Sequence, residues 1–184
     1  MSETPTKPHT TPQKITDLVA ELDWRGLIKD CTDKDGLRDH LASGQRKIYC
    51  GFDPTADSLT IGNLVPIMML AHVKRAGHTP IVVMGGGTGL IGDPSGKSAE
   101  RMMMTAETVQ HHVDRQRPIF ENVLGQIDGP QHAIKNNLDW LGGISYIEAL
   151  RDIGKHFSVN MMMQKESVKE RLNNREQGIS YTEF

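Results

Sequence analysis

The sequence predicts an α/β fold built on a doubly wound parallel β-sheet. Short apolar runs that suit buried strands alternate with longer stretches of helical periodicity, and this alternation is typical of parallel sheets. A glycine-rich stretch directly follows one of the apolar runs, as expected where the end of a strand meets a ligand-binding loop. The 184 residues are enough for one domain with a sizeable core.

The first quarter of the chain is predicted to hold a tail, two helices and a strand. Residues 1–13 are polar and rich in Pro and Thr, which is typical of a disordered tail. Apolar positions over 15–28 approximate a helical period, and a second short helix is expected over 35–42, with Gly44 just past its end. The first strand is expected over 46–50.

A turn rich in Asp, Pro and Thr then leads into a helix and a second strand. The helix is expected from about residue 61 to 76. Gly77 would end it, and Lys74 and Arg75 are favourably placed in its last turn. The strand is expected over 79–84, with its proline near the start, where a missing N–H is tolerated.

The rest of the chain is predicted to be mostly helical. After the glycine-rich loop a helix is expected over 105–124, and 133–140 is interpreted as another strand. Two further helices are expected over 144–154 and 161–172. The adjacent histidines at 111 and 112 are interpreted as surface and packing residues.

Composition narrows the class of protein. Hydrophobic residues make up 37% of the chain, charged residues 24%, and the net charge is −2, so there is no basic excess for non-specific nucleic-acid binding. Cys31 and Cys50 lack CxxC spacing, so neither a disulfide framework nor a zinc site is predicted. The longest apolar run, 64–71, is far shorter than the roughly 20 residues of a membrane helix. We therefore expect a soluble, cytoplasmic protein with no membrane partner.

The glycine-rich loop partly matches two phosphate-binding motifs, and neither match holds. Residues 87–92 fit G-x-G-x-x-G, but Asp93 and Pro94 follow, which favours a turn and places a carboxylate where a phosphate would lie. Residues 96–98 resemble the end of a P-loop, but the first glycine of that motif would fall at Ile91. Because glycines weaken folding unless close backbone approach is useful, a ligand-lining loop is predicted.

Residues 49–64 carry the stronger signal, because they combine a strand, a tight turn and the start of a helix. Free N–H groups and the positive end of the dipole make a helix N-terminus an anion site. Thr55, Thr60 and Asn63 can add side-chain donors, and Gly62 leaves room for a nucleotide ring against the backbone. The alternative is that Ser58 or Thr60 merely caps the helix and that Asn63 is an ordinary polar residue of its first turn. At the carboxyl end of a parallel sheet, this segment favours ATP binding.

This segment reads YCGFDPTADSLTIGNL and resembles the first signature of the class I aminoacyl-tRNA synthetases, usually written HIGH, in its tyrosyl-tRNA synthetase form. Four later runs resemble the same family in the same order: AGHTPIVVMGGGTGLIGDPSGKSAER, KNNLDW, LRDIGKHFSVN and GISYTEF. The resemblance implies that 14–184 is the N-terminal part of a Rossmann-like catalytic domain, incomplete on its C-terminal side. A helical dimer-forming insertion would begin within 144–184.

The resemblance also implies a two-step reaction. L-tyrosine and ATP, with Mg²⁺, would give tyrosyl-adenylate and pyrophosphate, and the tyrosyl group would then pass to the 3′ end of the cognate tRNA. ATP would be a co-substrate, with no tightly bound cofactor and no resident metal. The rate would come from positioning and from donors aimed at the charge on the departing phosphates. A homodimer is expected.

The tyrosine-binding residues are carried over by the same resemblance. Tyr49 would donate to the substrate phenol from the floor of the pocket, and Asp93 would face the substrate ammonium group. Thr88, Asn137 and Trp140 would line or brace the same pocket.

The ATP-binding and catalytic residues come from the same source. The ATP ribose and α-phosphate would be bordered by Cys50, Gly51, Asp53, Gly62 and Asn63. The groups that assist the reaction at the phosphates would be Thr55, Thr60, Asn63, Lys97 and Arg101, the last two meeting the leaving pyrophosphate.

Two departures from the family pattern affect these expectations. Thr60 stands at the first histidine of HIGH and Asn63 at the last position, so both can donate a hydrogen bond but neither can carry a positive charge. The family's second lysine signature and tRNA-binding parts do not appear in the sequence, so we expect no aminoacylation by this chain alone. A truncated synthetase-like paralog that acts as a binding or interaction module stays open as an alternative.

Overall fold

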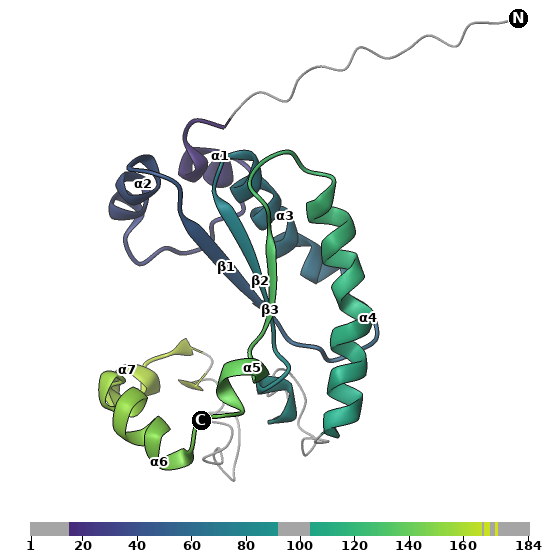
Figure 1. The fold of residues 1–184 in the computed structure, drawn as a ribbon. Coiled ribbons are helices and arrows are strands. Elements are labelled where there is room, and N and C mark those ends of the chain that lie inside the picture. The colour runs from purple at the N-terminus through teal and green to yellow at the C-terminus, as the bar shows by residue number, and fades with distance from the viewer. Residues whose placement is uncertain (1–14, 92–103, 167, 170–171, 173–184) are drawn as a thin grey trace, which may run out of the picture. The chain divides into compact units, whose positions relative to one another are not determined.

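The computed structural model describes residues 15–91, 104–166, 168–169 and 172, and Figure 1 shows their fold. The expected tail therefore lies outside the described residues. By its internal contacts the chain divides into two compact units. The described residues of the first are 15–50, 59–82 and 118–134, and those of the second are 51–58, 83–117 and the described part of 135–172.

Three strands form a parallel sheet: β1 (Lys47–Phe52), β2 (Thr79–Met84) and β3 (Ala133–Asn136), in the order β1-β2-β3. β1 and β2 run in the same direction, because Thr79 N–H donates to Arg46 O and Gly85 N–H donates to Phe52 O, each at 2.8 Å. The three arrows lie side by side in Figure 1. The predicted α/β class is confirmed, although β1 runs two residues further than expected.

In the first unit, short helices pack around a small apolar cluster. The helix α1 (Leu18–Trp24) begins at Asp17, whose carboxylate accepts from Ala20 N–H at 2.9 Å. It ends just before Gly26, which has a φ of +68°, so the helix is shorter than the 15–28 periodicity indicated. Leu18 and Leu22 of α1 are buried with Val73 of α3 (Ile61–Arg75). The second helix, α2 (Lys34–Ala42), contacts α1 and matches its prediction closely.

The end of α3 is fixed by a glycine and by a buried lysine. Gly77 has a φ of +91°, a left-handed conformation that favours glycine, and it stops the helix as predicted. Lys74 is only 5% exposed, and its ammonium group donates to Leu124 O at 2.7 Å. Lys74 therefore satisfies a carbonyl near the end of another helix, α4 (Ala106–Gly125), in addition to lying in the last turn of its own.

In the second unit, the chain after β3 turns at once into helical segments. The helix α5 (Leu138–Leu141) follows β3, so the strand expected over 133–140 ends early. Next come α6 (Tyr146–Glu148), a π-helical segment (Ala149–Ile153), a 3₁₀ turn (Gly154–His156) and α7 (Val159–Met163). These short segments of different helix type stand where two continuous helices were expected, over 144–154 and 161–172.

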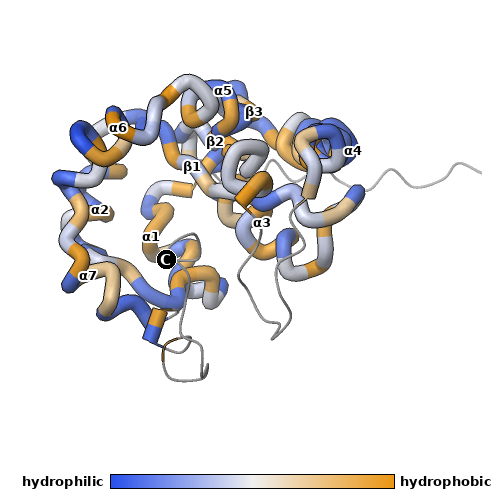
Figure 2. Tube along the Cα trace, turned by 90° about the horizontal axis from the view of Figure 1, so that it is seen from below, coloured by the Kyte–Doolittle hydropathy of each residue, from blue (hydrophilic) through white to orange (hydrophobic). Residues whose placement is uncertain are grey.

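Apolar positions are interspersed along the α6–α7 stretch (Figure 2), and several of its large apolar side chains are exposed. Ile147 is 67% exposed and Phe157 60%. None of the helices in the described ranges combines the length and apolar character that crossing a bilayer requires.

Candidate active site

A hydrogen-bond network joins the residues that follow the three strands, all within the second unit. Asn137 is buried just after β3; its side-chain oxygen accepts from Gly87 N–H at 2.6 Å, and its amide group donates to Thr88 Oγ1 at 3.1 Å. The Thr88 hydroxyl donates to Asp53 Oδ1 at 3.1 Å. Three predicted site residues, Asp53, Thr88 and Asn137, are therefore brought into one connected chain. A network with every member paired holds its side chains in fixed positions.

The glycine-rich loop after β2 packs tightly on this network. Thr88–Leu90 form a 3₁₀ turn (η1), and a Cβ at Gly85 would overlap the Asp53 carboxylate and lie 2.8 Å from Thr88 Oγ1. A Cβ at Gly86 would lie 2.6 Å from the side-chain nitrogen of Asn136. In the described part of the loop, these glycines therefore let the loop backbone pack closely against protein side chains.

The start of α3, in the first unit, carries the residues that replace the histidines of the family signature. Thr60 is the N-cap residue of α3. The side-chain oxygen of Asn63 accepts from both Thr60 N–H at 2.8 Å and the Thr60 hydroxyl at 2.9 Å. A Cβ at Gly62 would approach only Thr60 Oγ1, at 3.5 Å, so the surface beside it is open. Both bonds of this pair use the side-chain oxygen of Asn63, so its side-chain nitrogen can donate to a ligand.

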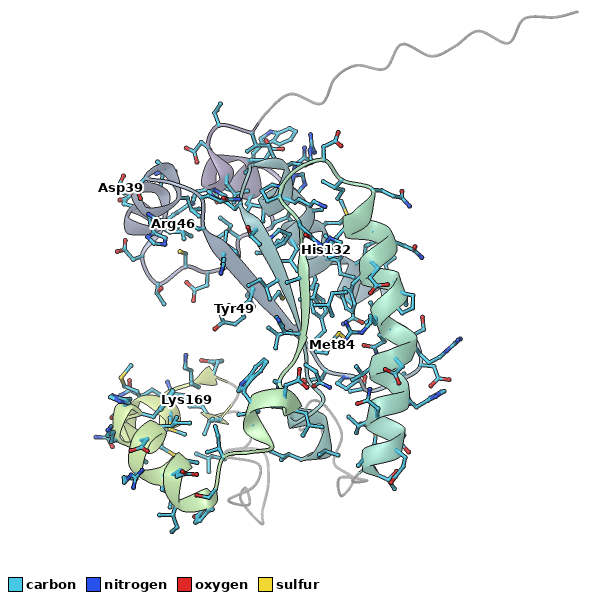
Figure 3. All side chains as sticks on the ribbon, viewed as in Figure 1. Asp39, Arg46, Tyr49, Met84, His132 and Lys169 are labelled. Carbon is cyan, nitrogen blue, oxygen red and sulfur yellow. The ribbon has the colours of Figure 1, made fainter. Side chains whose placement is uncertain are left out.

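Two predicted site residues, Tyr49 and Cys50, lie in the middle of β1 in the same unit. Tyr49 is 74% exposed, and its side chain stands out from β1 in Figure 3. The described residues therefore do not form the enclosed pocket floor that was expected around its phenol. Burial raises the pKa of the Cys50 thiol, which keeps it neutral around pH 7.

Three other predicted residues of the second unit are also exposed. Thr55 is exposed. It follows Asp53 by two residues in the loop, and its N–H donates to Asp53 O at 3.0 Å. A Cβ at Gly51 would meet nothing within 4 Å. Trp140, on α5, is 46% exposed.

The remaining predicted residues, Asp93, Lys97 and Arg101, lie outside the described residues. Within the described part of the chain, no group of three or more His, Cys, Asp or Glu side chains is arranged to hold a metal ion.

Two residues of α4 contact the loop that carries Asp53 and Thr55, and sequence reasoning missed them. The ring of His112 lies 2.9 Å from Pro54 O through Nδ1, and Gln116 Nε2 donates to Ala56 O at 2.7 Å. For Gln116 a signal was present: it is buried and continues the apolar spacing of Val109 and Val113, where a polar residue is unexpected. For His112 the sequence carried no comparable signal. The adjacent residue His111 is also a histidine, and nothing in the sequence indicates which of the two contacts the loop.

A parallel sheet with a glycine-rich loop at its carboxyl end defines the chain as a Rossmann-like α/β protein. The family model described as tRNA synthetases class I (W and Y) matches residues 42–184. The chain belongs to this family, and the resemblance found in its motifs is confirmed.

Curated relatives named tyrosine–tRNA ligase share high identity with the chain. Those of Citrobacter koseri and of Escherichia coli O139:H28 are each 52% identical over 170 residues, which is 92% of this chain and 40% of the relative. The chain thus spans about 40% of the length of these relatives.

Solved structures agree with the fold. A C-terminally truncated mitochondrial tyrosyl-tRNA synthetase of Aspergillus nidulans superposes with a TM-score of 0.77 at 27% identity, covering 92% of this chain and 51% of that one. The corresponding protein of Coccidioides posadasii gives 0.73 at 26% identity, covering 92% and 48%. The Rossmann-like interpretation is therefore confirmed.

Proposed function

We propose that this chain carries the ATP- and tyrosine-binding part of a tyrosine–tRNA ligase. The carboxylate of L-tyrosine attacks the α-phosphorus of ATP, which gives tyrosyl-adenylate and releases pyrophosphate; the tyrosyl group then passes to the 3′ end of the cognate tRNA, and AMP leaves. The observation that carries the proposal is the Asp53–Thr88–Asn137 network, because it fixes polar groups after the strands at the end of the sheet where open α/β proteins bind ligands. The relatives' printed name supplies the joining of tyrosine to tRNA, and the adenylate step is what the family resemblance implies.

On the nucleotide side, each residue has a role that its surroundings support. Thr88 orients the Asp53 carboxylate, which is an acceptor suited to the ribose hydroxyls. Gly51 leaves open space beside the strand end, and Gly62 does so at the start of α3. The positive end of the α3 dipole, together with the Asn63 amide nitrogen, favours a phosphate. Mg²⁺ would arrive bound to the phosphates of ATP.

On the amino-acid side, the phenol of Tyr49 would hydrogen-bond the substrate hydroxyl, and Asn137 would brace the glycine-rich loop through Gly87. The cognate tRNA, a homodimeric assembly and a cytoplasmic location belong to the same proposal. Because the chain spans about 40% of the curated relatives, we expect it to bind the small substrates without transferring tyrosine to tRNA.

The test uses Gly51→Ala, since a Cβ at this position meets no protein atom within 4 Å. The variant should keep the melting temperature of the parent chain and bind ATP with Mg²⁺ at least about tenfold more weakly by calorimetry, a loss of about 1.4 kcal/mol. Gly125→Ala is the matched control, because a Cβ there also meets nothing within 4 Å and the residue has no proposed role. A folded parent chain that binds no ATP, or equal ATP affinity in all three proteins, would refute the proposal.

A further inference from the structure

The loop Asp53–Asp57 is held by two side chains from the first three turns of α4, all within the second unit. His112 Nδ1 lies 2.9 Å from Pro54 O, and His112 Nε2 lies 3.2 Å from Asp57 Oδ1. One turn further along α4, Gln116 Nε2 donates to Ala56 O at 2.7 Å. Two hydrogen bonds to loop carbonyls, at Pro54 and Ala56, thus hold the turn that carries Asp53 and Thr55.

The contact between His112 and Pro54 determines which ring nitrogen of His112 carries a proton. A carbonyl oxygen can only accept, so the ring must carry its proton on Nδ1 to bond Pro54. The other nitrogen lies 3.2 Å from Asp57 Oδ1 and bonds that carboxylate only when it also carries a proton, so the bond from Nδ1 to Pro54 is the contact that holds the loop backbone. The side chain is 13% exposed, whereas that of His111 is 59% exposed and lies 3.3 Å from the Asp57 carboxylate. The two adjacent histidines therefore differ in whether they hold loop backbone.

Gln116 supplies an independent observation. The residue is 1% exposed and lies in the apolar stripe of α4, and its side-chain oxygen has no hydrogen-bond partner among the described residues. A buried acceptor without a partner costs free energy, so an apolar side chain of similar size would pack there more favourably. The benefit that offsets this cost is the bond from its amide nitrogen to Ala56 O.

We propose that His112 and Gln116 are positioning residues for the nucleotide side of the site. They fix the loop so that Asp53 stays within reach of Thr88 and Thr55 stays exposed at its turn. The part of the proposal that concerns ATP rests on the proposed function; the part that concerns loop order does not.

The experiment is residue-resolved amide hydrogen exchange on the full chain. His112→Ala and Gln116→Met should each speed exchange of the 53–58 amides at least tenfold relative to the amides of β2, because the loop opens locally when its tethers are removed. His112→Asn should recover most of the protection, since its amide nitrogen can occupy the place of Nδ1. His111→Ala is the matched control and should leave loop exchange unchanged.

Two outcomes would overturn the proposal. One is loop exchange in His112→Ala and Gln116→Met equal to that of His111→Ala. The other is acceleration of the β2 amides by the same factor as the loop, which would indicate a general packing role. A second readout is ATP affinity: His112→Ala should bind ATP with Mg²⁺ at least threefold more weakly than His111→Ala, and equal affinities would contradict the positioning role. Absence of ATP binding in the parent chain, with the exchange pattern as expected, would refute the proposed function alone.

Discussion

At the scale of single residues, Thr60 and Asn63 form a neutral hydrogen-bonded pair where the family signature has histidines. Both protons that Thr60 can donate go to the same oxygen of Asn63, within one turn of α3. The pair therefore stabilises the start of the helix whether or not a ligand is present.

This pairing predicts that the two residues act as a unit in stability. Thr60→Ala and Asn63→Ala should each lower the free energy of unfolding by about 0.5–2 kcal/mol. The double variant should lose less than the sum of the two, because the bond between the Thr60 hydroxyl and Asn63 Oδ1 is lost in either single variant; the bond from the backbone N–H of residue 60 is lost only in Asn63→Ala. Urea denaturation measures all three. Thr32→Ala, at an exposed residue, is the control and should change stability by less than about 0.5 kcal/mol. Additive losses would contradict the pairing.

Gly86 gives a second prediction at this scale. A Cβ there would lie 2.6 Å from the side-chain nitrogen of Asn136, so Gly86→Ala should lower the free energy of unfolding by about 1–3 kcal/mol through overpacking. Gly143 is the contrasting position, because a Cβ there meets nothing within 4 Å. Thermal unfolding of both variants tests the difference, and a Gly86→Ala variant as stable as Gly143→Ala would show that the loop can move aside.

At the scale of elements, α4 contains a proline in its interior. Pro118 lacks the N–H that would bond the carbonyl four residues earlier, and its ring crowds that turn. The residue is exposed, so no core packing compensates for the lost bond. The helix persists because Val109, Val113, Phe120 and Leu124 bury its apolar stripe.

We therefore expect Pro118→Ala to raise the free energy of unfolding by about 1 kcal/mol or more, since alanine restores the backbone bond and has the highest helix propensity. Asn122→Ala, at an exposed position of the same helix, should gain no more than about 0.7 kcal/mol from propensity alone. Chemical denaturation of the two variants provides the comparison. A loss of stability in Pro118→Ala would contradict this expectation.

The elements that local patterns specify were predicted well. The bounds of β2 were predicted without error, and those of α3 and α4 within one or two residues, because apolar period and glycine stops determine them. The strand expected over 133–140 was too long, because the backbone and side chain of Asn137 turn away to bond Met84 and the glycine loop. The Asp53–Thr88 and Thr88–Asn137 bonds join residues 35 and 49 positions apart, and no sequence period links such partners.

At the scale of the whole molecule, two buried histidines and one half-buried histidine of the first unit make stability depend on pH. Burial is the main cause that lowers the pKa of His72, His78 and His132, and nearby cations add to it. For His78 the cation is Arg46, whose backbone N–H also donates to His78 Nδ1. The carboxylate of Glu21 partly opposes the effect at His72, and that of Glu121 does so at His132.

Because the folded state holds these protons less tightly than the unfolded state, stability is fully present above the ordinary histidine pKa of 6.5 and is lost as pH falls below it. Each group can contribute at most about 1.4 kcal/mol per pH unit. Urea denaturation at pH 7.5 and 5.5 should therefore give a lower unfolding free energy at pH 5.5. His78→Asn should reduce this difference, and His40→Asn, at an exposed histidine, should not. Equal stability at both values would contradict the assignment.

The central claim, that this chain binds tyrosine and ATP as part of a tyrosine–tRNA ligase, is tested most directly by one comparison of ligands. Calorimetry would measure binding of a non-hydrolysable sulfamoyl analogue of tyrosyl-adenylate and of its phenylalanyl counterpart. The tyrosyl analogue should bind at least about tenfold more tightly, because a polar partner such as Tyr49 is left without its hydrogen bond when the substrate hydroxyl is missing. Equal binding of the two analogues, or no binding of either by the folded chain, would contradict the account.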